Sequence, residues 1–154
     1  MGRFSELIAR ELGLAADSVE RVRIAGVLHD VGRVGLPDAL MAKQGPLDDA
    51  EWTLIRSHPE IGARMLATTD FVDIGSWIRS HHERPDGRGY PDGAPDGGVP
   101  LEASILAVAD AYEAMTADRS YRAPLDAQEA SEELRRGAGL QFDGRVVNAL
   151  LRVV

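Results

Sequence analysis

The sequence contains no cysteine, and only four of its 154 residues are histidine. The absence of cysteine excludes disulfide bonds, zinc–thiolate sites and cysteine nucleophiles. Any metal site in this chain must therefore be built from histidine, aspartate and glutamate side chains. The lack of cysteine also fits a reducing compartment, and we expect a cytoplasmic protein.

Long apolar runs and an excess of basic residues are also missing. Apolar runs such as 105–109 are short, whereas a helix that crosses a bilayer needs about 20 apolar residues. The formal net charge is −8, while a broad nucleic-acid-binding surface is usually basic. We therefore expect no membrane span and no DNA or RNA partner. A small anionic ligand remains compatible with a local cluster of arginines.

Helical patterning covers most of the chain. Four segments begin at an acidic N-cap, and the first three have glutamate three residues later, which is the signature of a capping box. These N-caps are Asp17, Asp48, Asp126 and Asp143. The first three predict helices that run to His29, to His58 and to Gly137, and the fourth predicts a C-terminal helix. Further helices are predicted at 4–12, 60–67, 71–82 and 101–116.

No segment alternates apolar and polar residues as a strand does. Residues 83–100 form a Gly/Pro-rich stretch that cannot be helical. A loop of that length inside a helical domain is often functional. The sequence thus predicts a single all-α domain, a compact helical bundle spanning 1–154 with a long loop at 83–100. We also expect both tryptophans, Trp52 and Trp77, to lie in its core.

The histidines and one aspartate occupy conspicuous places in this pattern. His81 shares a helix face with the apolar residues Ile74 and Ile78, and Asp110 interrupts the apolar run 105–109. A buried carboxylate or imidazole needs a partner, and a divalent cation would satisfy both. The residues alone leave simpler alternatives open. Each histidine could be a hydrogen-bonded core residue, and Asp110 could pair with an arginine.

An ordered series of motifs resembles the HD-GYP branch of the HD metal-dependent phosphohydrolases. The motifs cover nearly the whole chain and are highly specific as a set. They lie at 29–33 (HDVGR), 81–83 (HHE), 86–91 (DGRGYP), 108–116 (VADAYEAMT), 118–122 (DRSYR) and 141–143 (QFD).

The resemblance implies a helical fold and hydrolysis of cyclic di-GMP to pGpG or GMP. It also implies a centre of two or three divalent metals, commonly iron or manganese. If the domain acts as a binding module, a diguanylate cyclase domain is one protein partner that we would expect. The metal ligands implied by position are His29, Asp30, His58, His81, His82 and Asp110, with Asp30 bridging two metals. The implied substrate-binding residues are Tyr90, Arg119 and Arg122.

Two departures from the family pattern affect the expected chemistry. The family carries a further histidine upstream of the His-Asp pair, and matching residues 8–14 to that helix places this ligand before Met1. The resemblance therefore predicts a domain that lacks the N-terminal part of its first helix and one metal ligand. The second departure is Arg33, where the family usually has lysine. Arginine keeps a positive charge beside a phosphate but cannot donate a proton at neutral pH.

Three functions follow from these observations. The first is a cyclic di-GMP phosphodiesterase in which a metal-activated water attacks, with Asp30 and Arg33 as catalytic residues. The second is a catalytically weak HD-GYP module that binds a nucleotide or a signalling protein, which the missing ligand favours. The third is an HD phosphohydrolase acting on a nucleotide or another phosphate ester, and the long loop around Tyr90 argues against it.

Overall fold

A computed structural model describes residues 1–93, 98–118 and 124–154. Within these ranges the protein is helical, and an isolated bridge between Ala138 and Phe142 is its only β-type pairing. The helical elements of the described ranges are α1 (Gly2–Glu11), α2 (Ala16–Leu28), the 3-10 helix η1 (Val31–Gly35), α3 (Asp38–Met41), α4 (Asp49–Ile55), α5 (His58–Leu66), α6 (Val72–Ser80), α7 (Leu101–Thr116), α8 (Ala127–Gly137) and α9 (Gly144–Leu150). The predicted all-α class is confirmed, while η1 and α3 were not predicted.

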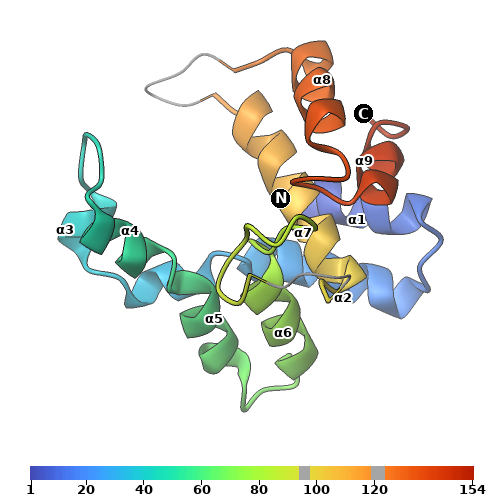
Figure 1. Cartoon of the computed structure of the whole chain (residues 1–154). Helices are drawn as coiled ribbons and strands as arrows, with labels where there is room; N and C mark the ends of the chain where they lie inside the picture. The colour runs from blue at the N-terminus through green and yellow to red at the C-terminus, as the bar shows by residue number, and fades with distance from the viewer. Residues whose placement is uncertain (94–97, 119–123) are drawn as a thin grey trace.

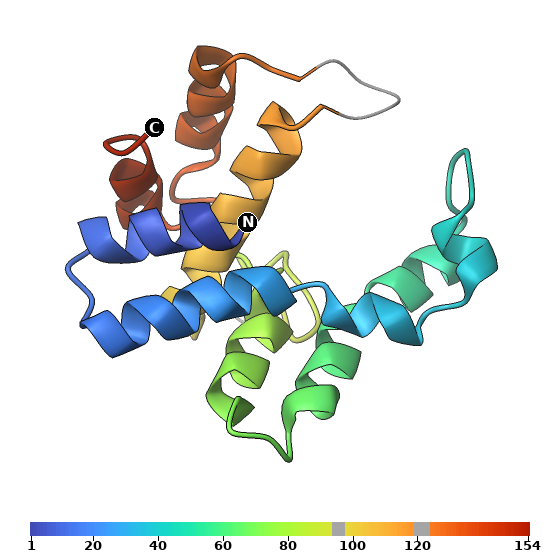
Figure 2. The same ribbon diagram turned by 180° about the vertical axis from the view of Figure 1, so that it is seen from behind.

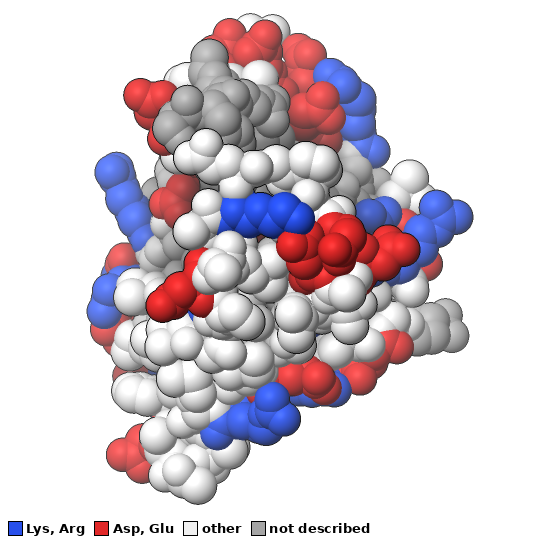
Figure 3. Space-filling view, turned by 90° about the vertical axis from the view of Figure 1, so that its left-hand side faces the viewer, with Lys and Arg blue, Asp and Glu red and all other residues white. Residues whose placement is uncertain are grey.

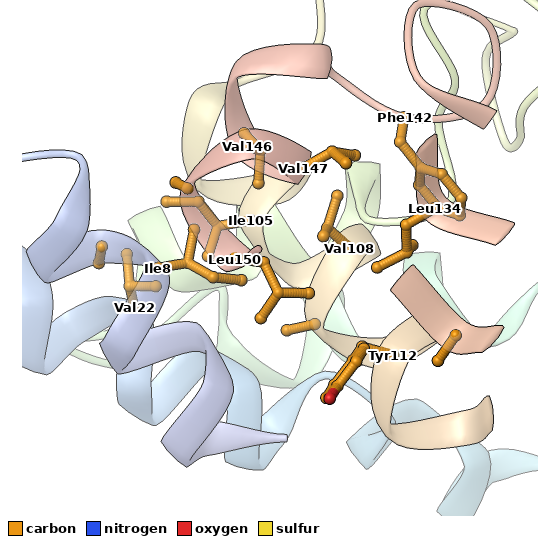
Figure 4. Packing of buried hydrophobic residues seen from close by; sticks show 14 of the residues in the cluster. Ile8, Val22, Ile105, Val108, Tyr112, Leu134, Phe142, Val146, Val147 and Leu150 are labelled. Atoms are coloured by element: carbon orange, nitrogen blue, oxygen red, sulfur yellow. The ribbon is translucent and has the colours of Figure 1, made fainter. Parts of the chain in front are cut away.

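Helix α7 is the centre of the bundle and contacts α1, α2, α6, α8 and α9 (Figure 1). Its face toward α1, α8 and α9 carries Ile105, Val108 and Tyr112, which pack in the larger hydrophobic cluster with Ile8 and Leu150 (Figure 4). Another face carries Leu106, which packs in a second cluster with Ile74 and Ile78 of α6. Asp110 lies one helical turn after Leu106, so α7 carries this carboxylate toward α6.

Three of the four predicted acidic N-caps are confirmed. Asp48 and Asp126 form complete capping boxes with the glutamates three residues later, and Asp143 accepts a hydrogen bond from the backbone N–H of Arg145. The prediction for Asp17 is wrong. Ala15, in an extended conformation, is the N-cap of α2. Asp17 lies in the first helical turn, where its negative charge favours the helix dipole.

The region around His58 also differs from the prediction. Helix α4 ends at Ile55, and His58 begins α5 instead of ending the preceding helix. Pro59 explains the difference, because proline is well tolerated in the first turn of a helix, where its missing N–H has no intrahelical partner. His58 therefore lies at a helix start, directly after a two-residue turn.

Helices α3 and α4 form an arm that projects from the bundle (Figures 1 and 2). Helix α4 has no buried residue, and the side chain of Trp52 is 47% exposed. The prediction that Trp52 is a core residue is therefore wrong, whereas Trp77 is partly buried against both hydrophobic clusters. The capping box of Asp48 and Glu51 and the ion pair between Lys43 and Glu51 hold the arm together locally.

No helix in the described part of the chain is long and apolar enough to cross a membrane. On the face seen from the arm side, acidic and basic side chains occur in small groups separated by neutral surface (Figure 3). This face carries no continuous basic stripe, as expected from the net charge of −8.

Candidate metal centre

All four histidines converge on one point, and each comes from the end of a helix. His29 is the C-cap of α2, His58 is the first residue of α5, and His81 is the C-cap of α6, with His82 directly after it. The rings of His58 and His82 have centroids 5.2 Å apart, and the rings of His29 and His81 have centroids 5.5 Å apart. These helix ends meet because α2 and α6 pack against α7, while α5 packs against α6 and η1.

Three of the histidines are oriented by the same backbone contact. In His29, His58 and His81, Nδ1 lies against the carbonyl oxygen of the residue three positions earlier, at 2.9, 2.7 and 2.5 Å. A carbonyl oxygen only accepts hydrogen bonds, so Nδ1 carries the proton in each ring. When such a ring is neutral, Nε2 is left with a free lone pair, which is the form of histidine that binds metals.

The Nε2 atoms meet in the interior without hydrogen-bond partners. The side chains of His58 and His81 are each 1% exposed, and Nε2 of both residues is buried and unsatisfied. One ligand atom from each of His58, His81 and His82 lies within 4.8 Å of the others. Buried polar atoms without partners are costly. A divalent cation would satisfy all three nitrogens, so the residues present fit a metal ion.

Asp30 connects this group to a second one. Its Oδ1 lies 3.2 Å from Nε2 of His58, and its Oδ2 lies 3.3 Å from Nε2 of His29. Nε2 of His29 also lies 3.6 Å from Oδ1 of Asp110. The two oxygens of one carboxylate therefore face different histidine groups, as a carboxylate shared by two cations would.

Burial and neighbouring charges set the protonation of these groups. Burial lowers the pKa of His81 to about 4 and that of His82 to about 3, so both rings are neutral at pH 7. Burial also disfavours the charged form of His29, but contacts with Asp110 and Asp30 outweigh it and raise its pKa to about 9. The same contacts hold the pKa of Asp30 and of Asp110 below the usual value despite burial. The site thus offers ionised carboxylates and the neutral imidazoles of His81 and His82, while His29 carries a proton.

The loop after His82 places Tyr90 over the histidines. The Tyr90 ring stacks on His82 with centroids 4.7 Å apart, and burial raises the pKa of its hydroxyl to about 12. The buried carboxylate of Glu83 accepts a hydrogen bond from the backbone N–H of Asp92 at 2.6 Å. The Asp92 side chain in turn pairs with Arg79 of α6. These contacts anchor the loop on both sides of Tyr90.

Arg33 lies beside the centre, with its Nε 2.8 Å from Oδ1 of Asp30. The structure thus brings together seven predicted site residues and stacks an eighth, Tyr90, on His82. The predicted substrate contacts Arg119 and Arg122 lie outside the described residues. Glu83, which directly follows His82, is 3% exposed and anchors the loop.

A cavity of about 400 Å³ opens next to the centre. His81, His82, Asp110 and Tyr90 line it, together with Arg56. The sequence analysis did not identify Arg56 as a site residue. A signal was present, because Trp52 lies four residues before Arg56, on the same face of a helix, and His58 follows two residues later. The contact of Arg56 with Tyr90 joins distant parts of the chain and could not be read from spacing.

Comparison with known proteins identifies relatives over almost the whole chain. Residues 1–146 match a family model described as HD domain. The chain is 39% identical to the cyclic di-GMP phosphodiesterase response regulator RpfG of Xanthomonas campestris, over 99% of this chain and 41% of that protein. It is 35% identical to a cyclic di-GMP phosphodiesterase of Thermotoga maritima, over 99% of this chain and 42% of that protein. A 3'3'-cGAMP-specific phosphodiesterase 2 of Vibrio cholerae is 34% identical, with 96% of this chain and 29% of that protein covered. The chain thus spans about two fifths or less of the length of these relatives.

Solved structures share the fold. The cyclic GMP-AMP-specific phosphodiesterase V-cGAP3 of Vibrio cholerae aligns with a TM-score of 0.77 at 18% identity, over 99% of this chain and 42% of that one. An HD-GYP-type protein of Bdellovibrio bacteriovorus, Bd1817, aligns with a TM-score of 0.73 at 19% identity, over 99% of this chain and 49% of that one. At these identities the likeness concerns the arrangement of the helices.

Proposed function

Because the chain belongs to the HD domain family, in its HD-GYP branch, we propose that it hydrolyses a phosphodiester bond of a cyclic dinucleotide at a centre of two divalent metals. The relatives named above act on cyclic di-GMP or on 3'3'-cGAMP. Cyclic di-GMP is the preferred candidate substrate, and pGpG or GMP would be the product. The activity is a proposal for this chain because its relatives are longer proteins.

HD domain phosphohydrolases bind divalent metals, and the cluster of His58, His81 and His82 fits one. The observation that carries our proposal is the position of Asp30, whose two oxygens lie 3.2 and 3.3 Å from Nε2 of His58 and of His29. We assign Asp30 as the bridging ligand. His29 and Asp110 would hold one metal, and the cluster would hold the other. Mixed nitrogen and oxygen ligands favour iron or manganese over magnesium or calcium.

The metals, when bound, would neutralise charge on the phosphate and lower the pKa of a water molecule. The protein's own residues perform the other tasks. Asp30 sets the position of both groups of ligands. Arg33 contacts Asp30 and would offer its remaining N–H groups to the phosphate oxygens. Because arginine stays protonated, Arg33 would stabilise charge and would not transfer a proton. Tyr90 would cover the centre and exclude water from its outer side.

A catalytically weak binding module is the second candidate. All four histidines of the sequence lie in the two ligand groups, so no further histidine is available to the group of His29 and Asp110. A metal held by three protein ligands would bind more weakly than one held by four. Such a module would bind the nucleotide, or a partner such as a diguanylate cyclase domain, without turning substrate over.

Metal content and turnover distinguish the two candidates. We would purify the protein without oxygen, measure its metals by mass spectrometry, and follow cyclic di-GMP and 3'3'-cGAMP by chromatography. The phosphodiesterase requires about two equivalents of iron or manganese per chain and a linear product. One equivalent or fewer, with nucleotide binding but no product, would instead establish the binding module.

A further inference from the structure

Arg56 contacts the faces of two aromatic rings at the cavity beside the metal centre. Its Cζ is 5.7 Å from the centre of the Trp52 ring and 5.6 Å from the centre of the Tyr90 ring, and it lies over both. Tyr90 itself stacks on His82. A cation over an aromatic face is held by the ring's quadrupole, which leaves its hydrogen-bond donors unused. The two rings therefore fix the position of Arg56 without using its N–H groups.

Most other arginines near the site are neutralised by acids. Arg33 pairs with Asp30, and Arg84 pairs with Asp86. Within the described residues, no carboxylate oxygen lies within 4 Å of Arg56, and its guanidinium donates no hydrogen bond. Arg88, which also lines the cavity, shares this lack of an ion pair but has no ring contact to hold it. Arg56 is thus a positioned cation without an anion in a protein with a net charge of −8.

We propose that Arg56 binds the second phosphate of the cyclic dinucleotide, the one that is not cleaved. This inference rests on the proposed function, which places the cleaved phosphate at the histidines and Asp30. A cyclic dinucleotide carries two phosphates on opposite sides of one ring. When one phosphate occupies the centre, the other must be received elsewhere in the cavity. A planar guanidinium with free donors suits a phosphate because it can donate two parallel hydrogen bonds.

The positions of the arginines favour this assignment over a role at the cleaved phosphate. Arg33 contacts Asp30 at the centre and does not line this cavity, whereas Arg56 does. Arg56 contacts neither Asp30 nor Asp110 within 4 Å, and it reaches the cavity from the arm, through Tyr90. The projecting helix α4 would therefore help to position Arg56, because it carries Trp52, whose ring contacts the guanidinium. In the competing interpretation, the guanidinium of Arg56 donates its two hydrogen bonds to the edge of a guanine base.

The first test compares Arg56→Gln with the wild-type protein on substrates with two phosphates and with one. The small diester bis(p-nitrophenyl) phosphate has a cleavable phosphate but no second one. We expect KM for cyclic di-GMP to rise about tenfold or more while kcat changes little. The ratio of kcat/KM between cyclic di-GMP and the small diester should fall by a similar factor. An unchanged ratio would overturn the proposal, because it would mean a structural role or a role at the cleaved phosphate.

The second test separates the phosphate from the base. Cyclic di-AMP has the same two phosphates but no guanine, so Arg56→Gln should weaken the binding of both dinucleotides by the same factor. A loss confined to cyclic di-GMP would assign Arg56 to guanine and refute the phosphate contact. Arg56→Lys keeps the charge but loses the fork and the stacking, so it should restore only part of the affinity. Trp52→Leu should lower the affinity for both dinucleotides about two- to fivefold, because it removes one of the two rings that hold Arg56.

Controls make the result independent of folding and of catalysis. Arg64→Gln is the matched control, because Arg64 is an exposed arginine on α5 outside the cavity. Affinity would be measured by calorimetry with a phosphorothioate analogue of cyclic di-GMP that resists hydrolysis. If the wild-type protein binds this analogue but hydrolyses nothing, the proposed phosphodiesterase fails and the Arg56 contact is still tested. Equal affinity of the wild type and Arg56→Gln would overturn the contact in either case.

Discussion

Nε2 of His58 lies 3.2 Å from Oδ1 of Asp30 and is buried without a hydrogen-bond partner, while Oδ1 also faces Nε of Arg33. Nδ1 of His58 already faces a carbonyl oxygen, so Nε2 is an acceptor whenever the ring is neutral. Two acceptors held this close repel each other unless a cation lies between them. The pair is therefore arranged for a ligand that the polypeptide itself does not supply.

Replacing Asp30 by asparagine tests its bridging role. The amide keeps the size of the side chain but removes the charge that two cations would share. We expect at least one metal to be lost and turnover to fall by at least about 100-fold, measured by metal analysis and steady-state kinetics. Asp49→Asn, on the exposed first turn of α4, is the control. A variant at position 30 with full metal content and an unchanged rate would rule out the bridge.

A substitution at Gly32 tests whether the close packing of η1 on α5 aligns Asp30 with His58. A Cβ atom at this position would lie 1.9 Å from the carbonyl oxygen of His58 and 2.6 Å from the backbone nitrogen of Gly62. Gly32→Ala must therefore push η1 away from α5 and separate Asp30 from His58. We expect a loss of about 1–3 kcal/mol in the free energy of unfolding, measured with denaturant, and weaker metal binding.

Gly144→Ala is the matched control for that experiment. Its Cβ would meet only the Ala138 side chain, at an ordinary 3.9 Å, and it lies at the start of α9. Its stability should stay the same or rise slightly, because alanine favours a helix over glycine. Equal destabilisation by both substitutions would show that the close packing of η1 on α5 does not matter.

The sequence allowed much of this architecture to be predicted, and the failures have physical causes. The capping boxes at Asp48 and Asp126 are local, so residue spacing revealed them. Asp17 has the same spacing, but an extended Ala15 is the N-cap, so the helix begins two residues earlier than predicted. The prediction that Trp52 lies in the core fails because α4 projects from the bundle and exposes this residue.

In the candidate site too, local motifs could be recognised from the sequence, whereas contacts between distant segments could not. The six proposed metal ligands could be named because the motifs carry them, and all six lie together in the structure. The Nδ1 contacts that orient three histidines depend on helix ends that spacing locates only within a few residues. The contact between Arg56 and Tyr90 joins positions 34 residues apart, through a loop whose path no pattern encodes.

Glu83 should position the loop that carries Tyr90. Its buried carboxylate accepts the N–H of Asp92 at 2.6 Å, and Asp92 also pairs with Arg79. Glu83→Ala removes that acceptor, and we expect about 1–3 kcal/mol lower stability and a higher KM from a displaced Tyr90. Glu83→Gln retains an acceptor oxygen, so its stability and its KM should stay close to the wild-type values. If alanine and glutamine behave alike in thermal unfolding and kinetics, the hydrogen bond does not hold the loop.

The metal-free protein should lose stability in alkaline solution through His29. Burial opposes its charged form, but Asp110 and Asp30 raise its pKa to about 9 from the ordinary 6.5. A group whose pKa is raised by folding contributes stability that is fully present below its unfolded pKa and is lost as pH rises through the folded value. Between pH 6.5 and 9.5, the free energy of unfolding of the chelated protein should therefore fall, by no more than about 3 kcal/mol.

The His29→Gln variant isolates this effect. Glutamine cannot titrate, so denaturant unfolding of the chelated variant should show a flatter dependence on pH over the same range. Wild-type protein loaded with metal should also lose the slope, because a cation replaces the proton on Nε2. A wild type and variant with parallel pH profiles would mean that the carboxylates of Asp30 and Asp110 do not hold a proton on His29 when the metal is removed.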